Sequence, residues 1–447
     1  MDRADKPFGI RGFVIDAPEF GSLRGRHRGG IVVGKGLIAE TGDYDDLRRS
    51  QQLKGIDWID HGAVAVFPGL IDCHTHLPQY PVVARGGSEL LPWLREYVFP
   101  IERDFTGPKA RIQAPLFFRE LARHGTTTAM IYTAIYEDSC DFAFEAARDS
   151  GLRIIMGKMM MDIASYGQLQ PKKVLSVSLL ESERLCRKWH GAENGRLEYA
   201  FSPRFAVTCS EKMMRGAAEL AGRLNAYLQT HLSENREEIE KVHHLYMGAS
   251  DYTHVYEKCG LLTPKTMLGH CNHLNSREIQ AIAVAQANIA HCPTSNLFLG
   301  SGLFKLDQMV RAGIAVGLGS DVAAGPELNM WQVMRAAIEV QKARGVYERS
   351  LSGLLPGEAF YLATQGGARA LGKGAVIGTF DPGKEADFII MDLPTLLPYP
   401  SERASLDQLS AEDIVSLCIY RGGPNATVES YVRGKPVYQK RPSSPPL

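Results

Sequence analysis

The length, composition and charge of the chain exclude several classes of protein. Its 447 residues suffice for one large core or two to three ordinary ones, and 45% hydrophobic and 22% charged residues are typical of a globular protein. Fifty basic side chains balance fifty acidic ones, which argues against nucleic acid or an anionic membrane as the partner and favours a small molecule. We expect a reduced, cytoplasmic protein, because the eight cysteines form no CxxC pair and the sequence has neither a membrane-spanning run nor a secretory signal.

The chain divides into three zones by its residue pattern. Residues 1–66 alternate short β-like runs with glycine and polar turns, and β-like runs return over residues 374–440. Because both ends are β-like and enclose an intact middle zone, we expect them to fold together as one small composite β-sandwich domain. The last residues, 441–447, are rich in proline and serine and are predicted to be a disordered tail.

The middle zone, residues 67–373, repeats strand, loop and helix. Eight apolar, strand-like runs end near His76, Thr133, Met160, Arg204, His231, His270, His291 and Asp321. Amphipathic segments predicted to be helices lie between them, at 108–123, 209–224, 276–286 and 306–312. Strands that alternate with helices form parallel sheets, and eight such units over about 300 residues predict a closed α/β barrel of the (β/α)8, TIM type. An open, doubly wound sheet is the alternative.

The ends of these predicted strands carry titratable side chains. Five of the eight runs finish on His or Asp, and a barrel gathers its active site at those ends. His74 and His76 are two residues apart on one strand, so their rings point to the same side. With His231 and Asp321 they make three imidazoles and a carboxylate, which predict a metal site with room for a water molecule. Zinc is the preferred ion and iron the alternative.

Three further side chains near the strand ends are candidates for proton transfer or support. Glu234 follows His231 by three residues, close enough to act as the acid/base that hydrolysis needs, although it could instead only begin a helix. His270 falls where it can hydrogen-bond the attacking water or the substrate. For His291, a supporting role beside the metal site and a structural role both stay open.

Longer motifs extend over most of the chain. The pair His74-Thr-His, the run His291-Cys-Pro-Thr-Ser-Asn and the element Gly383-Lys-Glu-Ala-Asp resemble the amidohydrolase superfamily as a whole. Three narrower motifs resemble its guanine deaminase family: Gln79 and Tyr80, Arg204 and Phe205, and Ser233-Glu-Asn. The stretch from Trp93 to Glu102 is among the other matching segments. The resemblance covers nearly the whole length of the chain. Pro92 and Ala324 depart from the family pattern near the expected pocket rim.

The resemblance implies a set of substrate contacts. Gln79 and Arg204 would hydrogen-bond a purine ring, Phe205 and Trp93 would flank it, and His231, Glu234 and Asp321 would also line the substrate site. Arg204 stands where two-metal members of the superfamily carry a bridging carboxylated lysine. Its cation would repel a second ion, so one Zn²⁺ per subunit is expected.

The resemblance also implies a reaction, the zinc-dependent deamination of guanine to xanthine and ammonia. Zinc-bound hydroxide would attack C2 while Glu234 carries a proton to N3, and His270 and Asp321 would orient the nucleophile. A homodimer is implied in the same way. The alternatives are a deaminase of another aminated heterocycle (a pterin, 8-oxoguanine, cytosine or a triazine) and a non-catalytic scaffold that has kept the barrel. The scaffold is disfavoured because no expected metal ligand is missing.

Overall fold

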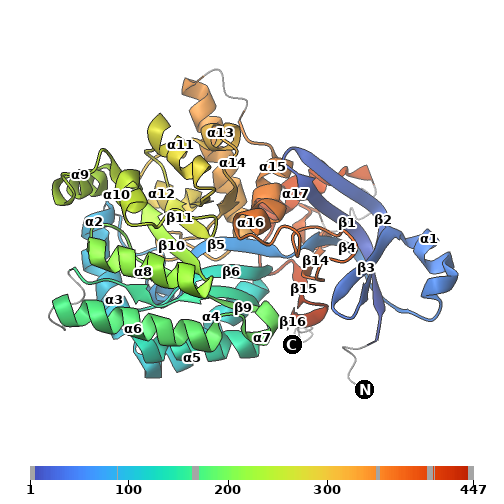
Figure 1. Ribbon diagram of the computed structural model, residues 1–447. Helices are drawn as coiled ribbons and strands as arrows, with labels where there is room; N and C mark the ends of the chain where they lie inside the picture. Colours follow the sequence, from blue (N-terminus) through green and yellow to red (C-terminus); the bar gives the residue numbers. More distant parts are fainter. Residues whose placement is uncertain are drawn as a thin grey trace, which may run out of the picture.

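The computed structural model describes residues 6–87, 89–163, 171–348, 353–399, 406 and 408–440. It has two parts, a barrel surrounded by helices and a sheet on one flank that contains both chain ends (Figure 1). The predicted disordered tail, 441–447, lies outside the described residues. Within the described residues, no helix is both long and apolar enough to cross a membrane.

Eight parallel strands form the barrel and follow one another in sequence order, which confirms the predicted (β/α)8 architecture and excludes the doubly wound alternative. The strands are β5 (Leu70–His76), β6 (Thr126–Tyr132), β7 (Arg153–Gly157), β9 (Leu197–Pro203), β10 (Tyr227–Leu232), β11 (Thr266–His270), β12 (Asn288–His291) and β13 (Val316–Leu318). The short β8 (Met159–Met160) pairs with the end of β9. Nearly all strand residues are buried, as expected for parallel strands covered by helices.

The ring closes between the last strand and the first. Just past β13, the backbone N–H of Asp321 donates to the carbonyl of His74 (2.8 Å), and that of Ser320 donates to Asp72 Oδ1 (3.0 Å). Gly319 permits this approach, because a Cβ there would lie 2.8 Å from the Cβ of His74. Closure therefore places Asp321 directly beside the first histidine of the predicted metal set.

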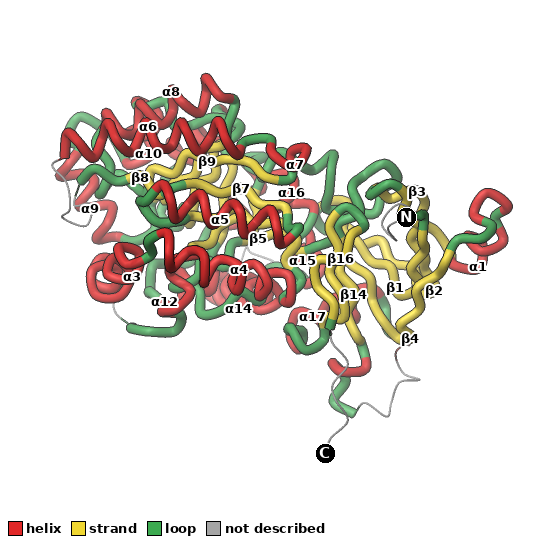
Figure 2. Tube along the Cα trace, turned by 90° about the horizontal axis from the view of Figure 1, so that it is seen from below, coloured by secondary structure: helices red, strands yellow, loops and turns green. Residues whose placement is uncertain are grey.

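Helices cover the outside of the barrel (Figure 2). They are α4 (Gly107–Arg123), α5 (Glu137–Ser150), α6 (Pro171–Trp189), α7 (Ala192–Gly195), α8 (Glu211–Leu224), α9 (Arg236–Leu245), α10 (Tyr252–Lys258), α11 (Ser276–Val284), α12 (Pro293–Phe298), α13 (Leu306–Arg311), α14 (Met330–Tyr347), α15 (Pro356–Ala363) and α16 (Gln365–Ala370). The four helices predicted from periodicity correspond to α4, α8, α11 and α13. In α8, Ser210 caps the first turn by accepting from the N–H of Met213, and one apolar face is buried.

A chain excursion between β5 and α4 lies at the mouth of the barrel. It consists of η3 (Leu77–Val82), α2 (Leu90–Trp93), the π-helical turn η4 (Leu94–Val98) and α3 (Phe99–Asp104). Its side chains Gln79, Trp93 and Glu102 are all buried. The first loop of the barrel thus provides part of the wall around the strand ends.

Strands from the N-terminal and C-terminal segments form one seven-stranded sheet, blue and red in Figure 1. Its strands lie in the order β16 (Lys435–Gln439), β15 (Thr427–Val432), β14 (Phe388–Asp392), β4 (Asp57–Pro68), β1 (Phe8–Glu19), β2 (Ser22–Gly34) and β3 (Leu37–Asp43). The short helices on this side are α1 (Tyr44–Arg49), η2 (Gln51–Leu53), η5 (Pro394–Leu396) and α17 (Ala411–Arg421). A separate β domain built from both terminal segments is confirmed, but its strands form one continuous sheet where the sequence predicted a sandwich of two. We keep 1–66 with 374–440, and 67–373, as the proposed domain limits.

A buried ionic junction joins the sheet to the barrel. Arg153, at the start of β7, donates to Asp387 through Nε (3.1 Å) and Nη2 (2.9 Å) and also pairs with Glu385. Arg433 donates its backbone N–H to Asp387 (2.8 Å) and its Nε to Glu385 (2.7 Å). Glu385 and Asp387 belong to the Gly-Lys-Glu-Ala-Asp element, which therefore connects the two domains.

Candidate active site

Four side chains from three strand ends meet at the mouth of the barrel. Nε2 of His74 and Nε2 of His76 are 3.3 Å apart, and Nε2 of His231 lies 3.2 Å from that of His76. Asp321 Oδ1 is 3.2 Å from His74 Nε2 and 3.3 Å from His76 Nε2. All four residues are buried. The structure thus brings together the four residues that the sequence predicted as metal ligands.

These spacings fit a metal ion. The atoms that bind an ion tetrahedrally through bonds of about 2.0 Å lie about 3.3 Å apart, close to the separations observed here. Without a cation or a shared proton, ring nitrogens that face one another across such a distance would repel. His231 Nδ1 donates to the carbonyl of Arg204 (2.7 Å), which leaves its Nε2 lone pair directed at the group. The donor set is therefore that of a divalent ion.

The protonation states in this group also suit a metal. Burial lowers the pKa of His76 to about 4 and lowers that of His231 well below its ordinary value. Burial opposes ionisation of Asp321, but hydrogen bonds with His74 and His76 hold its pKa well below the usual range. These shifts favour neutral imidazoles at His76 and His231 and a carboxylate at Asp321, the forms in which these groups bind metals.

A second nearby set contains Cys292 together with His74, His270 and Asp321. Burial raises the pKa of the Cys292 thiol well above its ordinary value, and only the thiolate is a good ligand. All eight cysteines are buried and free. The set of three histidines and one aspartate is therefore the better candidate.

The backbone is strained where the strands end. Ser233, His270 and Asp321 have φ values of 49°, 68° and 46°, in the left-handed region that side chains with a Cβ rarely adopt. Such strain persists where surrounding contacts enforce it, often at functional sites. Gly269 leaves room for the His74 ring, because a Cβ at this position would lie 2.8 Å from Cε1 of that ring.

Glu234 is held beside the metal group by its own network. Its Oε1 accepts from Ser301 Oγ (3.2 Å), its Oε2 lies 3.4 Å from His270 Nε2, and its backbone N–H donates to Glu238 (2.8 Å). Burial, with a contribution from the Asp321 carboxylate, raises its pKa well above the ordinary value. This shift favours the protonated carboxyl, the form that a proton donor needs.

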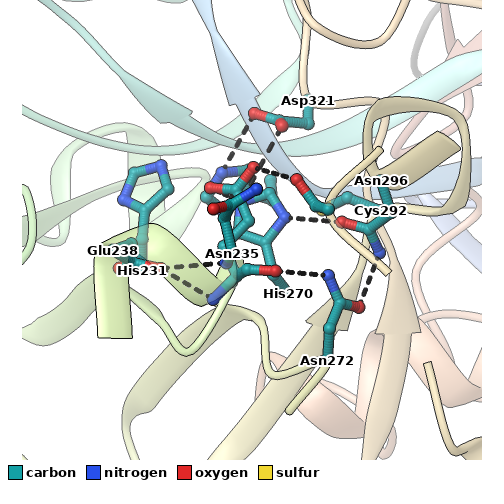
Figure 3. A network of polar contacts seen from close by, with 12 residues as sticks. His231, Asn235, Glu238, His270, Asn272, Cys292, Asn296 and Asp321 are labelled. Carbon is teal, nitrogen blue, oxygen red and sulfur yellow. Dashed lines mark hydrogen bonds and ion pairs between the residues drawn. The ribbon is translucent and has the colours of Figure 1, made fainter. Parts of the chain in front are cut away.

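A chain of two amides fixes the tautomer of His270 (Figure 3). The carbonyl of Glu234 can only accept, so Nδ2 of Asn272 donates to it (3.1 Å). Asn272 Oδ1 then accepts from Asn296 Nδ2 (2.9 Å), which turns Asn296 Oδ1 toward His270 Nδ1 (3.0 Å). Nδ1 of His270 must therefore carry a proton, and its Nε2 faces Glu234 at 3.4 Å and Asp321 at 3.8 Å.

One pocket opens onto this group. Its lining includes all the residues predicted to contact substrate: Gln79, Trp93, Arg204, Phe205, His231, Glu234 and Asp321. His270 lines it as well. The indole N–H of Trp93 donates to the carbonyl of Arg85 (2.9 Å), which fixes its ring at the pocket wall. The pocket thus combines apolar walls, a few fixed polar groups and the metal group, as small-molecule sites do.

Several residues of the site escaped the sequence analysis. Glu102 is fully buried and binds both Gln79 and Arg204. Asn272, Asn296 and Ser301 support His270 and Glu234, and Asp72 accepts from Ser320 and from the backbone of His74. The only available signals were the runs that contain them, since Glu102 ends the Trp93 stretch and Asn296 ends the His291 run.

His291 takes no part in the metal group. Its ring stacks on Phe304 with centroids 4.4 Å apart, and neither ring nitrogen has a hydrogen-bond partner among the described residues. Burial lowers its pKa to about 3. Of the two roles left open, these contacts favour the structural one.

Comparisons with known proteins agree with this geometry. Residues 65–426 match the model of the amidohydrolase family. A guanine deaminase of Escherichia coli is 36% identical over 431 residues, 96% of this chain and 95% of that protein. A solved E. coli guanine deaminase superposes with a TM-score of 0.88 at 35% identity, over 97% of this chain and all of that one. A guanine deaminase from C. acetobutylicum, solved with guanine in its active site, gives a TM-score of 0.90 at 29% identity, with the same coverage.

Proposed function

This chain belongs to the amidohydrolase family, and we propose that it catalyses the hydrolytic deamination of guanine to xanthine and ammonia. The observation that carries the proposal is the convergence of His74, His76, His231 and Asp321 at one pocket that also contains Glu234. The similarity to proteins named guanine deaminase over nearly their whole length supports the choice of substrate.

One divalent ion per subunit, preferably zinc, would be held by the three histidines and Asp321. When bound, such an ion lowers the pKa of a coordinated water to about 7 and so supplies a nucleophile at neutral pH. The Arg204 cation at the end of β9 disfavours a second ion there. Iron is the alternative occupant, since this donor set accepts several divalent ions.

Glu234 moves the proton. Its raised pKa favours the protonated carboxyl, which can hydrogen-bond N3 of the ring and donate its proton there as water adds to C2. The carboxylate that results takes one proton from the added water and passes it to the leaving amine. When the C2–N bond breaks and the C2 carbonyl forms, the carboxylate takes the second proton of the added water, so Glu234 ends protonated as it began. Guanine and water are thereby converted to xanthine and ammonia with no net change in protons on the protein.

His270 and the pocket walls orient the reactants. The fixed tautomer of His270 presents an Nε2 lone pair, so it accepts a hydrogen bond from the attacking water. Gln79 and Arg204 supply N–H donors that suit the 6-carbonyl of guanine, and Phe205 and Trp93 lie along the pocket where the ring faces would pack. We propose a cytoplasmic homodimer as the working state.

Metal analysis combined with product analysis tests the proposal. The purified protein should contain one equivalent of zinc and release equal amounts of xanthine and ammonia from guanine, and much less ammonia from pterin, 8-oxoguanine, cytosine and triazine substrates. Glu234→Gln should keep the metal and lose about 10²- to 10⁴-fold in kcat. Full turnover by a zinc-loaded Glu234→Gln protein would overturn the acid/base assignment, and faster ammonia release from another ring would overturn the substrate.

A further inference from the structure

Glu102 bridges Gln79 and Arg204, the two side chains proposed to bind position 6 of the purine ring. We call this pair of side chains the recognition wall. Glu102 lies on α3, outside the barrel strands, and its side chain is fully buried. One carboxylate oxygen, Oε1, accepts from Gln79 Nε2 at 2.8 Å, and the other accepts from Nη1 of Arg204. Arg204 is itself only 3% exposed, so the pair is a buried cation with a buried anion. The carboxylate thus joins the loop after the first barrel strand to the end of β9.

This bridge fixes which way the Gln79 amide points. A carboxylate can only accept hydrogen bonds, so the NH₂ group of Gln79 must face Glu102. Its carbonyl oxygen is then turned to the backbone N–H of Ala323, which donates to it at 3.1 Å. The lone pairs of the amide are directed at the backbone, and the polar group that Gln79 can present to the pocket is its second N–H.

The recognition wall therefore contains donors and no acceptors. A guanidinium has N–H donors alone, whatever else it contacts, and Gln79 is fixed with its acceptor turned away. Guanine has a carbonyl oxygen at position 6, which accepts, whereas adenine has an amino group there, which donates. A wall that contains only donors can bind the 6-carbonyl of guanine. With adenine, its N–H groups would face the N–H groups of the 6-amino substituent, and no hydrogen bond would form.

From this arrangement we infer that Glu102 is a positioning residue that makes the enzyme selective for a 6-oxo purine over a 6-amino purine. The inference rests on the proposed function, since it takes Gln79 and Arg204 to face the 6-position of a purine. Replacing Glu102 by glutamine would place an NH₂ group against either the Gln79 amide or the Arg204 guanidinium, both of which donate to Glu102. The Gln79 amide would then turn over, and an acceptor would enter the wall.

Binding of two non-hydrolysable ligands tests this. Hypoxanthine and adenine both lack the 2-amino group, and they differ in the 6-substituent and the N1 proton that accompanies it. By calorimetry on the metal-loaded protein, we expect the wild type to bind hypoxanthine roughly 100-fold more tightly than adenine. Glu102→Gln should reduce that ratio at least about 10-fold, mainly by weakening hypoxanthine binding. Glu102→Asp, which keeps the charge beside Arg204, should give an intermediate ratio and serves if the glutamine variant does not fold.

The control is Glu278→Gln. Glu278 is also buried and hydrogen-bonded, to Thr253 and Asn275, but it does not line the pocket. The Glu278→Gln protein should keep the wild-type ratio of hypoxanthine to adenine affinity. An unchanged ratio in metal-loaded Glu102→Gln, in a protein that deaminates guanine, would overturn the role of Glu102 alone. A wild-type protein that neither deaminates guanine nor prefers hypoxanthine would overturn the proposed function and this inference with it.

Discussion

The ionic junction between the domains and the mouth of the barrel both bury charge, but they use it differently. At the junction, Arg153 is buried against Asp387 and Glu385, while Arg433 donates its backbone N–H to Asp387 and its Nε to Glu385. At the mouth, Glu234 and Asp321 lie beside three imidazoles whose ring nitrogens point at a common centre. At the junction, the charged groups are partners for one another. At the mouth, the side chains are directed at an ion site and a pocket.

The difference shows how burial can serve either stability or binding. A buried charge with complete fixed partners contributes to the fold, and the loss of one partner is costly. A buried group with an incomplete partner set acquires a shifted pKa and affinity for a ligand, as Glu234 and His76 illustrate. The same residue types can therefore act as a structural connection or as an active site, depending on what completes their contacts.

Removal of the metal should abolish the chemistry at the barrel mouth and leave the junction intact. We expect it to have the largest effect of the changes considered. Dialysis against a chelator should lower guanine turnover at least about 1000-fold, because the nucleophile depends on the ion. One equivalent of zinc should restore it. Full turnover by protein shown to be metal-free would contradict the metal assignment.

Breaking the junction should affect stability alone. Arg153→Met leaves Asp387 with a buried, uncompensated charge, so we expect denaturant unfolding to show a loss of about 3–5 kcal/mol. Specific activity of the folded protein should stay within about 2-fold of wild type, because the junction does not reach the pocket. Arg11→Met is the matched control: Arg11 pairs with Asp60 at 2.9 Å in an exposed position and should cost at most about 1 kcal/mol. Equal losses of unfolding free energy in Arg153→Met and Arg11→Met would contradict the difference between the buried junction and an exposed ion pair.

The smallest effect concerns His291, whose buried ring nitrogens have no hydrogen-bond partner in the part of the chain that the structure describes. Its pKa is about 3 in the folded protein, below the ordinary value of about 6.5. Above pH 6.5 the ring is neutral in both states and adds no pH dependence. Below that pH only the unfolded state takes up the proton, so stability falls by about 1.4 kcal/mol per pH unit until the folded group titrates. In His291→Met this contribution should vanish, and unfolding of both proteins at pH 7.5, 6 and 5 measures it. Parallel pH profiles would contradict the neutral, buried state.

Much of the fold and of the metal group could be predicted from local pattern. The alternation of strands and helices gives the barrel, and the barrel places the strand ends together, so His74, His231 and Asp321 were identified although 247 positions separate the first from the last. The Glu102 bridge could not be predicted, because it pairs with a residue 102 positions away through a loop without periodicity. The amide chain through Asn272 and Asn296 escaped for the same reason.

By itself, the sequence determined the architecture and the residues that meet at the mouth, because strand periodicity and the rule for barrel strand ends operate on local pattern. Only the tertiary structure decided which atom of each side chain faces which. The tautomer of His270, the orientation of the Gln79 amide and the structural role of His291 depend on single hydrogen bonds or ring contacts between distant segments. Such contacts are fixed by packing in three dimensions, and local sequence does not encode them.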